Sequence, residues 1–309
     1  VSWVGDVYKR QKTYYQDGGI LREKYDACNN LIKRILPENY NAQTDDGAGY
    51  TYEYDEMNRL VKITNMEGVV EHKYIYNLAG NLIKDIDAKG YLQAENDEDR
   101  SGILYCYDLA GNVTQIRRPV SQTSDGQTKY RLNTYRYDLM GCCIEEKRYL
   151  EEQSEVSAEG RVNVIHYTYD QASRLTSVTD STGAHMEYAY DGRNLRTMER
   201  YKIAEGIYQE RHYTYSASGR LIKIMESADE KGCGRKYVPT QISYDGNGNI
   251  TRIQTPSGNE ILREYDQSNH LLSETHKEKG GSIQNRITFT YDLNGNLTQR
   301  MESNGFYTR

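Results

Sequence analysis

Acidic and amide side chains gather in short glycine-containing stretches whose spacing could bind calcium. The stretch DGNGN at residues 245–249 matches the opening of an EF-hand loop. An EF-hand also needs a bidentate Glu at its twelfth position, which is Pro256 here, and the same test on Asp292 reaches Ser303. Asp also caps turns, because its carboxylate accepts a hydrogen bond from the backbone N–H two residues later. We therefore predict turns with no metal and no cofactor.

The histidines, cysteines and remaining acidic residues are not spaced as in known catalytic motifs. The chain has no H-E-x-x-H, G-x-S-x-G or P-loop motif. The acid pairs Asp97 with Asp99 and Glu151 with Glu152 fall in polar insertions and are interpreted as solvated loop charge. His166 and His212 each precede a Tyr-Thr-Tyr and are interpreted as strand residues; the other histidines are His72, His185, His270 and His276. The cysteines form no C-x-x-C pair and are interpreted as packed or half-exposed thiols: Cys28, Cys106, Cys142, Cys143 and Cys233. We predict that this segment is not an enzyme and has no catalytic residues.

Composition excludes two classes of partner. The net charge of -6 lacks the concentrated basic face that nucleic acid requires. No apolar run approaches the roughly 18 residues that would predict a membrane span. Apolar residues make up 37% of the chain, and its aromatic residues are 30 Tyr, 2 Phe and 1 Trp. Because Tyr can bury its ring while its hydroxyl reaches a polar partner, this composition favours thin, wet sheets.

The acidic stretches belong to an internal repeat. With a Tyr as position 0, eleven copies begin 21 to 32 residues apart, at Tyr25, Tyr54, Tyr76, Tyr107, Tyr137, Tyr169, Tyr190, Tyr215, Tyr244, Tyr265 and Tyr291. A constant minimum spacing with variable excess indicates one structural unit with insertions. We call these eleven residues the anchor tyrosines.

Positions after each anchor predict a turn and then a strand. Position +1 is mostly a turn-capping Asp, at Asp55, Asp108, Asp138, Asp170, Asp191, Asp245, Asp266 and Asp292 among others. Position +4 is Gly, Asn or Ser, as expected for a left-handed corner, with Gly at Gly80, Gly111, Gly141, Gly219, Gly248 and Gly295. Position +6 is apolar in nine copies; Cys143 is one exception, and the Tyr190 copy reads as one residue short, with Leu195 early.

The remainder of each unit predicts a hairpin. Position -2 is usually Tyr, so two rings share one face of a strand. Further turns are predicted at 65–68, 87–90, 180–183 and 255–258, and polar insertions at 92–102, 121–129, 151–160 and 227–236 are expected to be lengthened hairpin tips on one rim. Apolar residues often recur three positions apart, as at Leu60 and Ile63, which leaves open whether they lie on opposite faces or a bulge intervenes.

The pattern Tyr-x-Tyr-Asp-x-x-Gly-Asn/Arg-Leu resembles the YD-repeat, or Rhs, family over residues 20–309. The resemblance implies an all-β fold of repeated antiparallel hairpins, forming a spiralling ribbon that is part of a hollow shell. In bacterial members the shell holds a toxic C-terminal polypeptide, which an aspartic-type autoprotease releases. That protease core carries Asp-Pro-x-Gly, and because none of the four prolines here follows an Asp, we expect it and the cargo outside this segment.

Residues 1–19 form an atypical N-terminal end. DVYKRQ, within residues 1–11, resembles a translated transposon-derived sequencing adaptor, so we expect that stretch to be a sequencing artefact. Residues 20–309 are expected to be an array of about eleven units, truncated at both ends. The predicted role is a non-catalytic shell segment, secreted or at the bacterial cell surface, whose partners are the rest of the shell and an encapsulated polypeptide. The alternative is a wall-associated adhesin that binds glycans through its Tyr faces.

Overall fold

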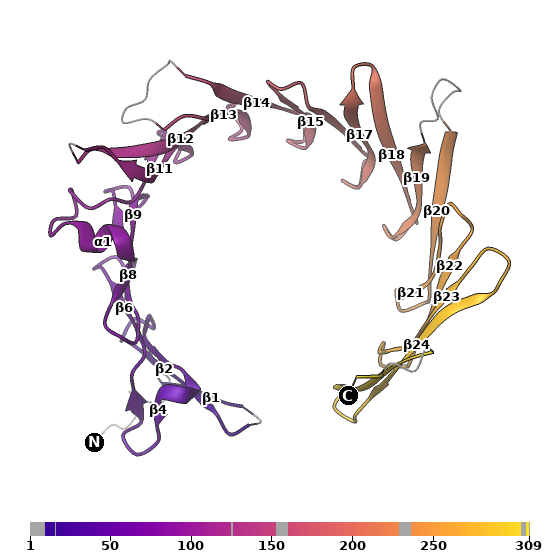
Figure 1. Cartoon of the computed structure of the whole chain (residues 1–309), viewed down its shortest axis with the longest axis horizontal. Helices are drawn as coiled ribbons and strands as arrows, with labels where there is room; N and C mark the ends of the chain where they lie inside the picture. The colour runs from indigo at the N-terminus through magenta and orange to yellow at the C-terminus, as the bar shows by residue number, and fades with distance from the viewer. Residues whose placement is uncertain are drawn as a thin grey trace. The chain divides into compact units, whose positions relative to one another are not determined.

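The computed structural model describes residues 10–15, 17–124, 126–152, 160–228, 236–303 and 307–308. Within these residues 24 strands belong to one sheet, and every strand pairing in it described here is antiparallel (Figure 1). The predicted all-β fold of antiparallel hairpins is thereby confirmed. Cys233 and residues 1–9 lie outside the described residues.

Contacts divide the chain into two units, residues 1–165 and 166–309. In the first unit each strand of the main sheet pairs with the next along the chain. These strands are β1 (Arg10–Tyr14), β2 (Ile20–Tyr25), β3 (Leu31–Ile35), β6 (Tyr50–Tyr54), β7 (Leu60–Thr64), β8 (Val70–Tyr76), β9 (Leu82–Asp87), β10 (Ile103–Tyr107), β11 (Val113–Gln122), β12 (Thr128–Tyr137) and β13 (Cys143–Tyr149). Strand β1 lies inside the segment 1–19 that the sequence set apart as atypical.

The second unit repeats this hairpin order. The division between the units falls within β14 (Val162–Tyr169). The following strands are β15 (Leu175–Asp180), β16 (His185–Tyr190), β17 (Arg196–Ala204), β18 (Ile207–Tyr215), β19 (Leu221–Ala228), β20 (Lys236–Tyr244), β21 (Ile250–Gln254), β22 (Glu260–Tyr265), β23 (Leu271–Lys277), β24 (Ile283–Tyr291), β25 (Leu297–Glu302) and β26 (Tyr307–Thr308).

Each unit is built with very little fully buried apolar surface. Among the described residues the buried hydrophobic side chains are Ile35, Ile86, Leu132 and Ile165. Most other strand residues are half-buried on a sheet face, which suits a chain whose rings carry hydroxyls. The strands are therefore held mainly by cross-strand pairs and backbone ladders rather than by a thick core.

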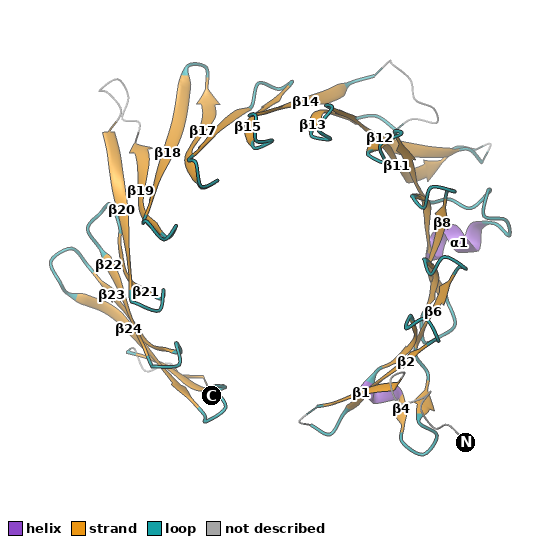
Figure 2. Ribbon diagram, turned by 180° about the vertical axis from the view of Figure 1, so that it is seen from behind, coloured by secondary structure: helices purple, strands orange, loops and turns teal. Residues whose placement is uncertain are grey.

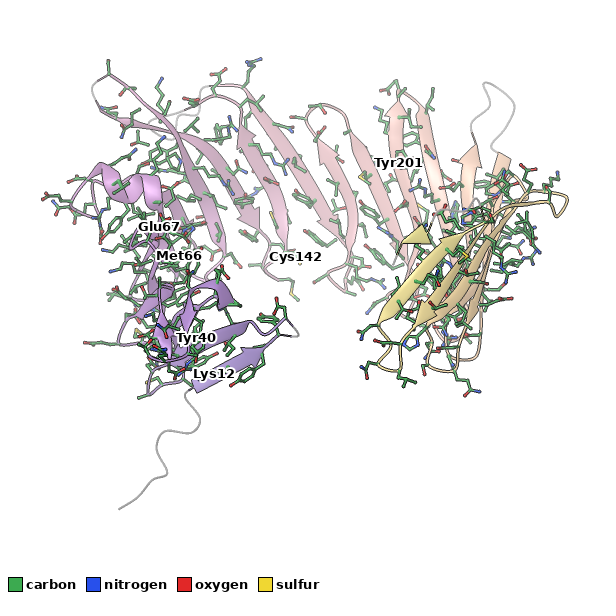
Figure 3. The ribbon with its side chains drawn as sticks, turned by 60° about the horizontal axis from the view of Figure 1, so that its bottom comes forward. Lys12, Tyr40, Met66, Glu67, Cys142 and Tyr201 are labelled. Carbon is green, nitrogen blue, oxygen red and sulfur yellow. The ribbon has the colours of Figure 1, made fainter. Side chains whose placement is uncertain are left out.

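A small cap covers the start of the sheet in the first unit. It consists of η1 (Pro37–Asn39), β4 (Tyr40–Asn41) and β5 (Asp46–Gly47). The carboxylate of Asp45 accepts hydrogen bonds from Arg22 Nε and Nη2, both at 3.0 Å, and from the Tyr40 hydroxyl at 2.8 Å. Lys12 also pairs with Asp45 and lies over the Tyr40 ring (Figure 3). Because Arg22 is only 1% exposed, Asp45 neutralises a buried charge.

A second cap, made of a short helix and the loop after it, lies where two other features were predicted. Residues 87–90 were expected to form a turn and residues 92–102 a lengthened hairpin tip, but Asp87 instead caps the helix α1 (Ala88–Gln93) by accepting from Gly90 N at 2.7 Å. Arg100 then fixes the loop, because its Nε donates to the carbonyls of Tyr91 and Ala94 and its guanidinium stacks on the Tyr91 ring. The helix contacts β8 and β9, so this insertion folds onto the sheet.

The two caps cover the same side of the first unit's sheet. Under the second cap, fully buried Ile86 pairs across strands with Lys73, whereas Tyr74 pairs with Asp85 on the opposite face. Under the first cap, Ile35 pairs with Arg22 on the face opposite Tyr25. Both caps therefore lie on the face that does not carry the anchor tyrosines. The insertion at 121–129 does extend a hairpin, between β11 and β12, as predicted.

Candidate functional site

The repeated turn is closed by the side chain at position +1. In the copy at Tyr107, Asp108 Oδ1 accepts hydrogen bonds from the backbone N–H groups of Ala110 and Asn112, both at 2.9 Å. Gly111 N donates to the Asp108 carbonyl at 3.1 Å, and Gly111 has a φ of 88°. The carboxylate thus satisfies two backbone donors of a tight, left-handed corner.

All eleven copies share this geometry. In every copy the side chain at +1 accepts a hydrogen bond from the backbone N–H at +5. The residue at +4 has a positive φ in each of them: Asn29, Asn58, Gly80, Gly111, Gly141, Ser173, Asn194, Gly219, Gly248, Asn269 and Gly295. The Tyr190 copy is therefore full length, with Asn194 at its corner, and its interpretation as one residue short was wrong.

Hydrogen bonding explains the acidic residues of these turns. Asp245 Oδ1 accepts from Gly248 N and Asn249 N, both at 2.8 Å, and its Oδ2 accepts from Asn249 Nδ2 at 2.9 Å. Hydrogen bonds from the Asn at +5 lower the pKa of Asp108, Asp245 and Asp292. Within the described part of the chain, no group of three or more His, Cys, Asp or Glu is arranged to hold a metal.

A bulge follows ten of these turns in the strand pairings described here and explains why apolar residues recur three positions apart. Tyr54 pairs with Leu60 and Tyr52 pairs with Ile63, and the register shifts between Glu53 and Tyr54. One extra residue is thus inserted on the second strand, which returns Leu60 and Ile63 to the same face as the two rings. The same shift recurs at Tyr25, Tyr76, Tyr107, Tyr137, Tyr190, Tyr215, Tyr244, Tyr265 and Tyr291.

In nine copies the anchor hydroxyl links its hairpin to the one before it. Tyr76 OH donates to the Leu60 carbonyl at 2.8 Å, and Tyr107 OH donates to the Leu82 carbonyl at 2.7 Å. In each case the acceptor is the +6 residue of the preceding repeat. Corresponding bonds come from Tyr54, Tyr137, Tyr190, Tyr215, Tyr244, Tyr265 and Tyr291.

The register explains why that carbonyl needs a side-chain donor. Strands β7 and β8 pair from Thr64 to Lys62, and Leu60 lies beyond this pairing, toward the turn. The Tyr76 hydroxyl reaches the Leu60 carbonyl there, so it satisfies a backbone acceptor where the two hairpins separate. Burial raises the pKa of Tyr76 and Tyr107, which keeps these donors protonated. We call this contact the tyrosine clamp.

Position +5 makes a second link between repeats. Arg59 Nε donates to Asp55 Oδ2 at 2.7 Å, and its guanidinium lies 4.6 Å from the centre of the Tyr76 ring in the next repeat. Arg174 and Arg220 lie over the next anchors in the same way, and His270 stacks on Tyr291 at 4.8 Å. Sequence reasoning missed this role; the recurrence of Arg, His and Asn at +5 was the available signal.

Several residues weighed for chemistry have structural partners. Asp97 pairs with Lys73 and Arg100 within the second cap, so it is not a solvated loop charge. Glu151 pairs with Arg161, and Glu152 accepts from the Ser121 hydroxyl. Five histidines lie beside carboxylates: His72, His185, His212, His270 and His276. The four described cysteines are free thiols, and His166 and His212 lie in strands β14 and β18, as predicted.

Part of this chain matches a known family, and most of it aligns with two longer proteins. The Teneurin YD-shell family model matches residues 149–262. Double-stranded DNA deaminase toxin A of Burkholderia cenocepacia (strain H111) is 25% identical over 237 residues, which cover 74% of this chain and 14% of that protein. Teneurin-1 of Gallus gallus is 22% identical over 283 residues, which cover 82% of this chain and 9% of that protein. The chain thus spans a small part of each relative.

Solved structures also align with this chain. The crystal structure of TcdB2–TccC3 without its hypervariable C-terminal region aligns with a TM-score of 0.46 and 15% identity, covering 97% of this chain and 19% of that one. The Tc holotoxin pore of Photorhabdus luminescens aligns with a TM-score of 0.35 and 14% identity, covering 94% and 19%. No helix in the described part of this chain is both long and apolar enough to span a membrane.

Proposed function

We propose that this chain, which carries the repeat of the YD-repeat shell family, is a non-catalytic wall segment of a shell that encapsulates a C-terminal polypeptide. Its partners are the remaining shell repeats and the enclosed polypeptide. The protein is secreted or displayed at a bacterial cell surface, where such a shell would deliver its contents.

The tyrosine clamp is the observation that carries this proposal. Nine anchors bond the carbonyl of the preceding repeat, so the hairpins are linked in series by side chains as well as by ladders. Such links stiffen a sheet that has few buried apolar residues. A stiff sheet with half-polar faces is suited to separate two aqueous spaces, which is what the wall of a container does.

The residues of the repeat support a structural rather than a catalytic role. The carboxylates at +1 accept hydrogen bonds from backbone N–H groups of their own turn, and the anchor hydroxyls of the clamp donate to backbone carbonyls. A glycan-binding surface would need free ring faces and hydroxyls, whereas Arg59 and His270 already cover the rings of Tyr76 and Tyr291. The clamp and the stacking therefore favour the wall over the adhesin.

Limited proteolysis of the full-length protein tests encapsulation. The C-terminal polypeptide is followed by mass spectrometry during trypsin digestion, with the same polypeptide expressed alone as the control. We expect the enclosed polypeptide to resist digestion in native buffer and to be cut rapidly in urea that unfolds the shell. Equal digestion rates for the enclosed and the isolated polypeptide would overturn the proposal, and saturable binding on a glycan array would support the adhesin instead.

A further inference from the structure

Three successive turns in the first unit each present a fully exposed leucine. The residues occupy position +2: Leu78 is 104% exposed, Leu109 is 109% exposed and Leu139 is 106% exposed. Met140, which follows Leu139, is 77% exposed. The turns join β8 to β9, β10 to β11 and β12 to β13, so they lie side by side along the rim where these strands end (Figure 2). We call Leu78, Leu109, Leu139 and Met140 the leucine rim.

The turn itself does not require leucine at +2. The corresponding residues of the second unit are Gln171, Gly192, Ala217, Gly246, Gln267 and Leu293, and Leu293 has no leucine in the turn before it. These turns are closed by the same hydrogen bond as the turns of the leucine rim, from the backbone N–H at +5 to the side chain at +1. Three adjacent exposed leucines therefore have no structural explanation in the fold, and such a patch indicates an interaction surface.

Polar groups beside the leucine rim are already satisfied. Asn77 Oδ1 accepts from Asn81 N, and Asp108 Oδ1 from Ala110 N and Asn112 N. Asp138 Oδ1 accepts from Met140 N and Cys142 N, both at 2.9 Å. Cys142 marks this third turn in Figure 3. A partner that buries the leucines would therefore not strip hydrogen bonds from these three caps.

Open grooves separate the three leucines. The groove between the first and second turns is lined by residues that include Ala79, Ile83, Tyr105 and Ala110. The groove between the second and third turns is lined by residues that include Asn112, Tyr137, Leu139 and Met140. The rim thus alternates apolar projections with partly apolar grooves, which can receive the side chains of a partner.

The spacing of the rim selects the kind of partner. Successive turns are two strands apart, and strands lie about 4.8 Å apart, so the leucines recur about every 10 Å. Seven residues of an α-helix rise about 10.5 Å, which places residues i, i+7 and i+14 in step with the rim. An extended strand advances about 3.3 Å per residue, so three residues match the distance but point to alternate faces. A helix fits this period and a strand does not.

We propose that the leucine rim binds an amphipathic α-helix of a partner polypeptide, with apolar residues repeating every seven positions along one face. The size of the rim agrees with a single helix. The rim has only four apolar side chains, and even the largest apolar patch of a typical monomer covers about 300–600 Å², whereas a stable complex of two folded copies buries about 800 Å² on each partner. This inference does not depend on encapsulation, because a helix could dock whether or not the shell is filled.

Binding of a designed peptide tests the proposal. The probe is a fluorescent three-heptad helix with leucines in every heptad on one face, and its control has the same composition in scrambled order. Fluorescence anisotropy is measured with the full-length protein and with the variant Leu78→Gln/Leu109→Gln/Leu139→Gln. Gln occupies +2 naturally at Gln171 and Gln267, so the variant is expected to fold. Leu293→Gln is the matched control, because Leu293 is 107% exposed at an isolated +2 position.

We expect saturable binding of the heptad peptide, a loss of about tenfold or more in affinity for the triple variant, and no change for Leu293→Gln. Equal binding of the scrambled peptide, or equal affinity for the triple variant, would overturn the proposal. Absence of saturable binding would do the same. Analytical ultracentrifugation of the unmodified and triple-variant proteins supplies a further test: self-association that the triple variant abolishes would assign the rim to a second copy and overturn the helix.

Discussion

At the scale of single residues, the anchor tyrosine has two functions, and the sequence predicted one of them. Alternation along the strand predicted that the ring packs on a sheet face. The hydroxyl donating to the preceding repeat was not predictable, because its acceptor is a backbone carbonyl that carries no sequence signal. Position 0 is Tyr in all eleven copies, whereas position -2 also accepts residues without a hydroxyl, namely Phe289, Ile242 and Arg263.

Removing one clamp hydroxyl should destabilise the protein modestly. In Tyr76→Phe the Leu60 carbonyl loses its donor, and we expect the free energy of unfolding to fall by about 1 kcal/mol. Urea unfolding measures the change. Tyr14→Phe is the control, because Tyr14 is 71% exposed and its substitution should change little. Equal effects of the two substitutions would contradict the clamp.

The capping aspartates should make stability sensitive to acid. Their pKa is lower in the folded state than the ordinary value of about 3.9, so their contribution is present above that value and is lost as pH falls through the folded pKa. The variant Asp108→Asn/Asp245→Asn/Asp292→Asn keeps a cap like that of Asn77 but has no charge to titrate.

We therefore expect the urea midpoint of this triple Asn variant to fall less than that of the unmodified protein between pH 5 and pH 2. The converse substitution Asn77→Asp should increase the acid sensitivity. Identical acid profiles for all three proteins would show that these carboxylates are not the titrating groups.

At the scale of elements, the turn was predictable and the bulge was not. Asp at +1 with Gly or Asn at +4 specifies the corner of the turn. Two apolar residues three positions apart, however, fit either a bulge or a change of sheet face. Asp87 shows a second limit. An Asp with Gly three residues later can close a turn or cap a helix, since both use the same hydrogen bond from backbone to carboxylate.

Substitutions at Gly111 separate backbone strain from crowding. A Cβ added there would meet nothing within 4 Å, so any cost arises from the φ of 88°. We expect Gly111→Ala to lower the free energy of unfolding by about 1–2 kcal/mol and Gly111→Val to lower it more. Gly111→Asn should cost less than either, because Asn58 and Asn194 occupy the same corner. Thermal unfolding of the three variants gives the ranking, and an equal cost for Asn and Val would refute the explanation.

At the scale of the whole molecule, local pattern predicted the run of hairpins but not what covers them. The two caps of the first unit depend on contacts between residues far apart in sequence, such as Arg22 with Asp45 and Lys84 with the Asp97 carbonyl. Isolated charges give no signal of such pairing, so the insertion 92–102 was predicted as a hairpin tip. The caps thicken the face opposite the anchors, which makes the two faces of the first unit's sheet chemically different.

The central claim is that these hairpins form the wall of an enclosure, and electron cryomicroscopy of the full-length protein tests it most directly. We predict that residues 20–302 appear as a continuous sheet within a larger shell, with density for another part of the polypeptide on one side only. A map in which this segment stands as an open ribbon, with both faces exposed to solvent and nothing enclosed, would contradict the account.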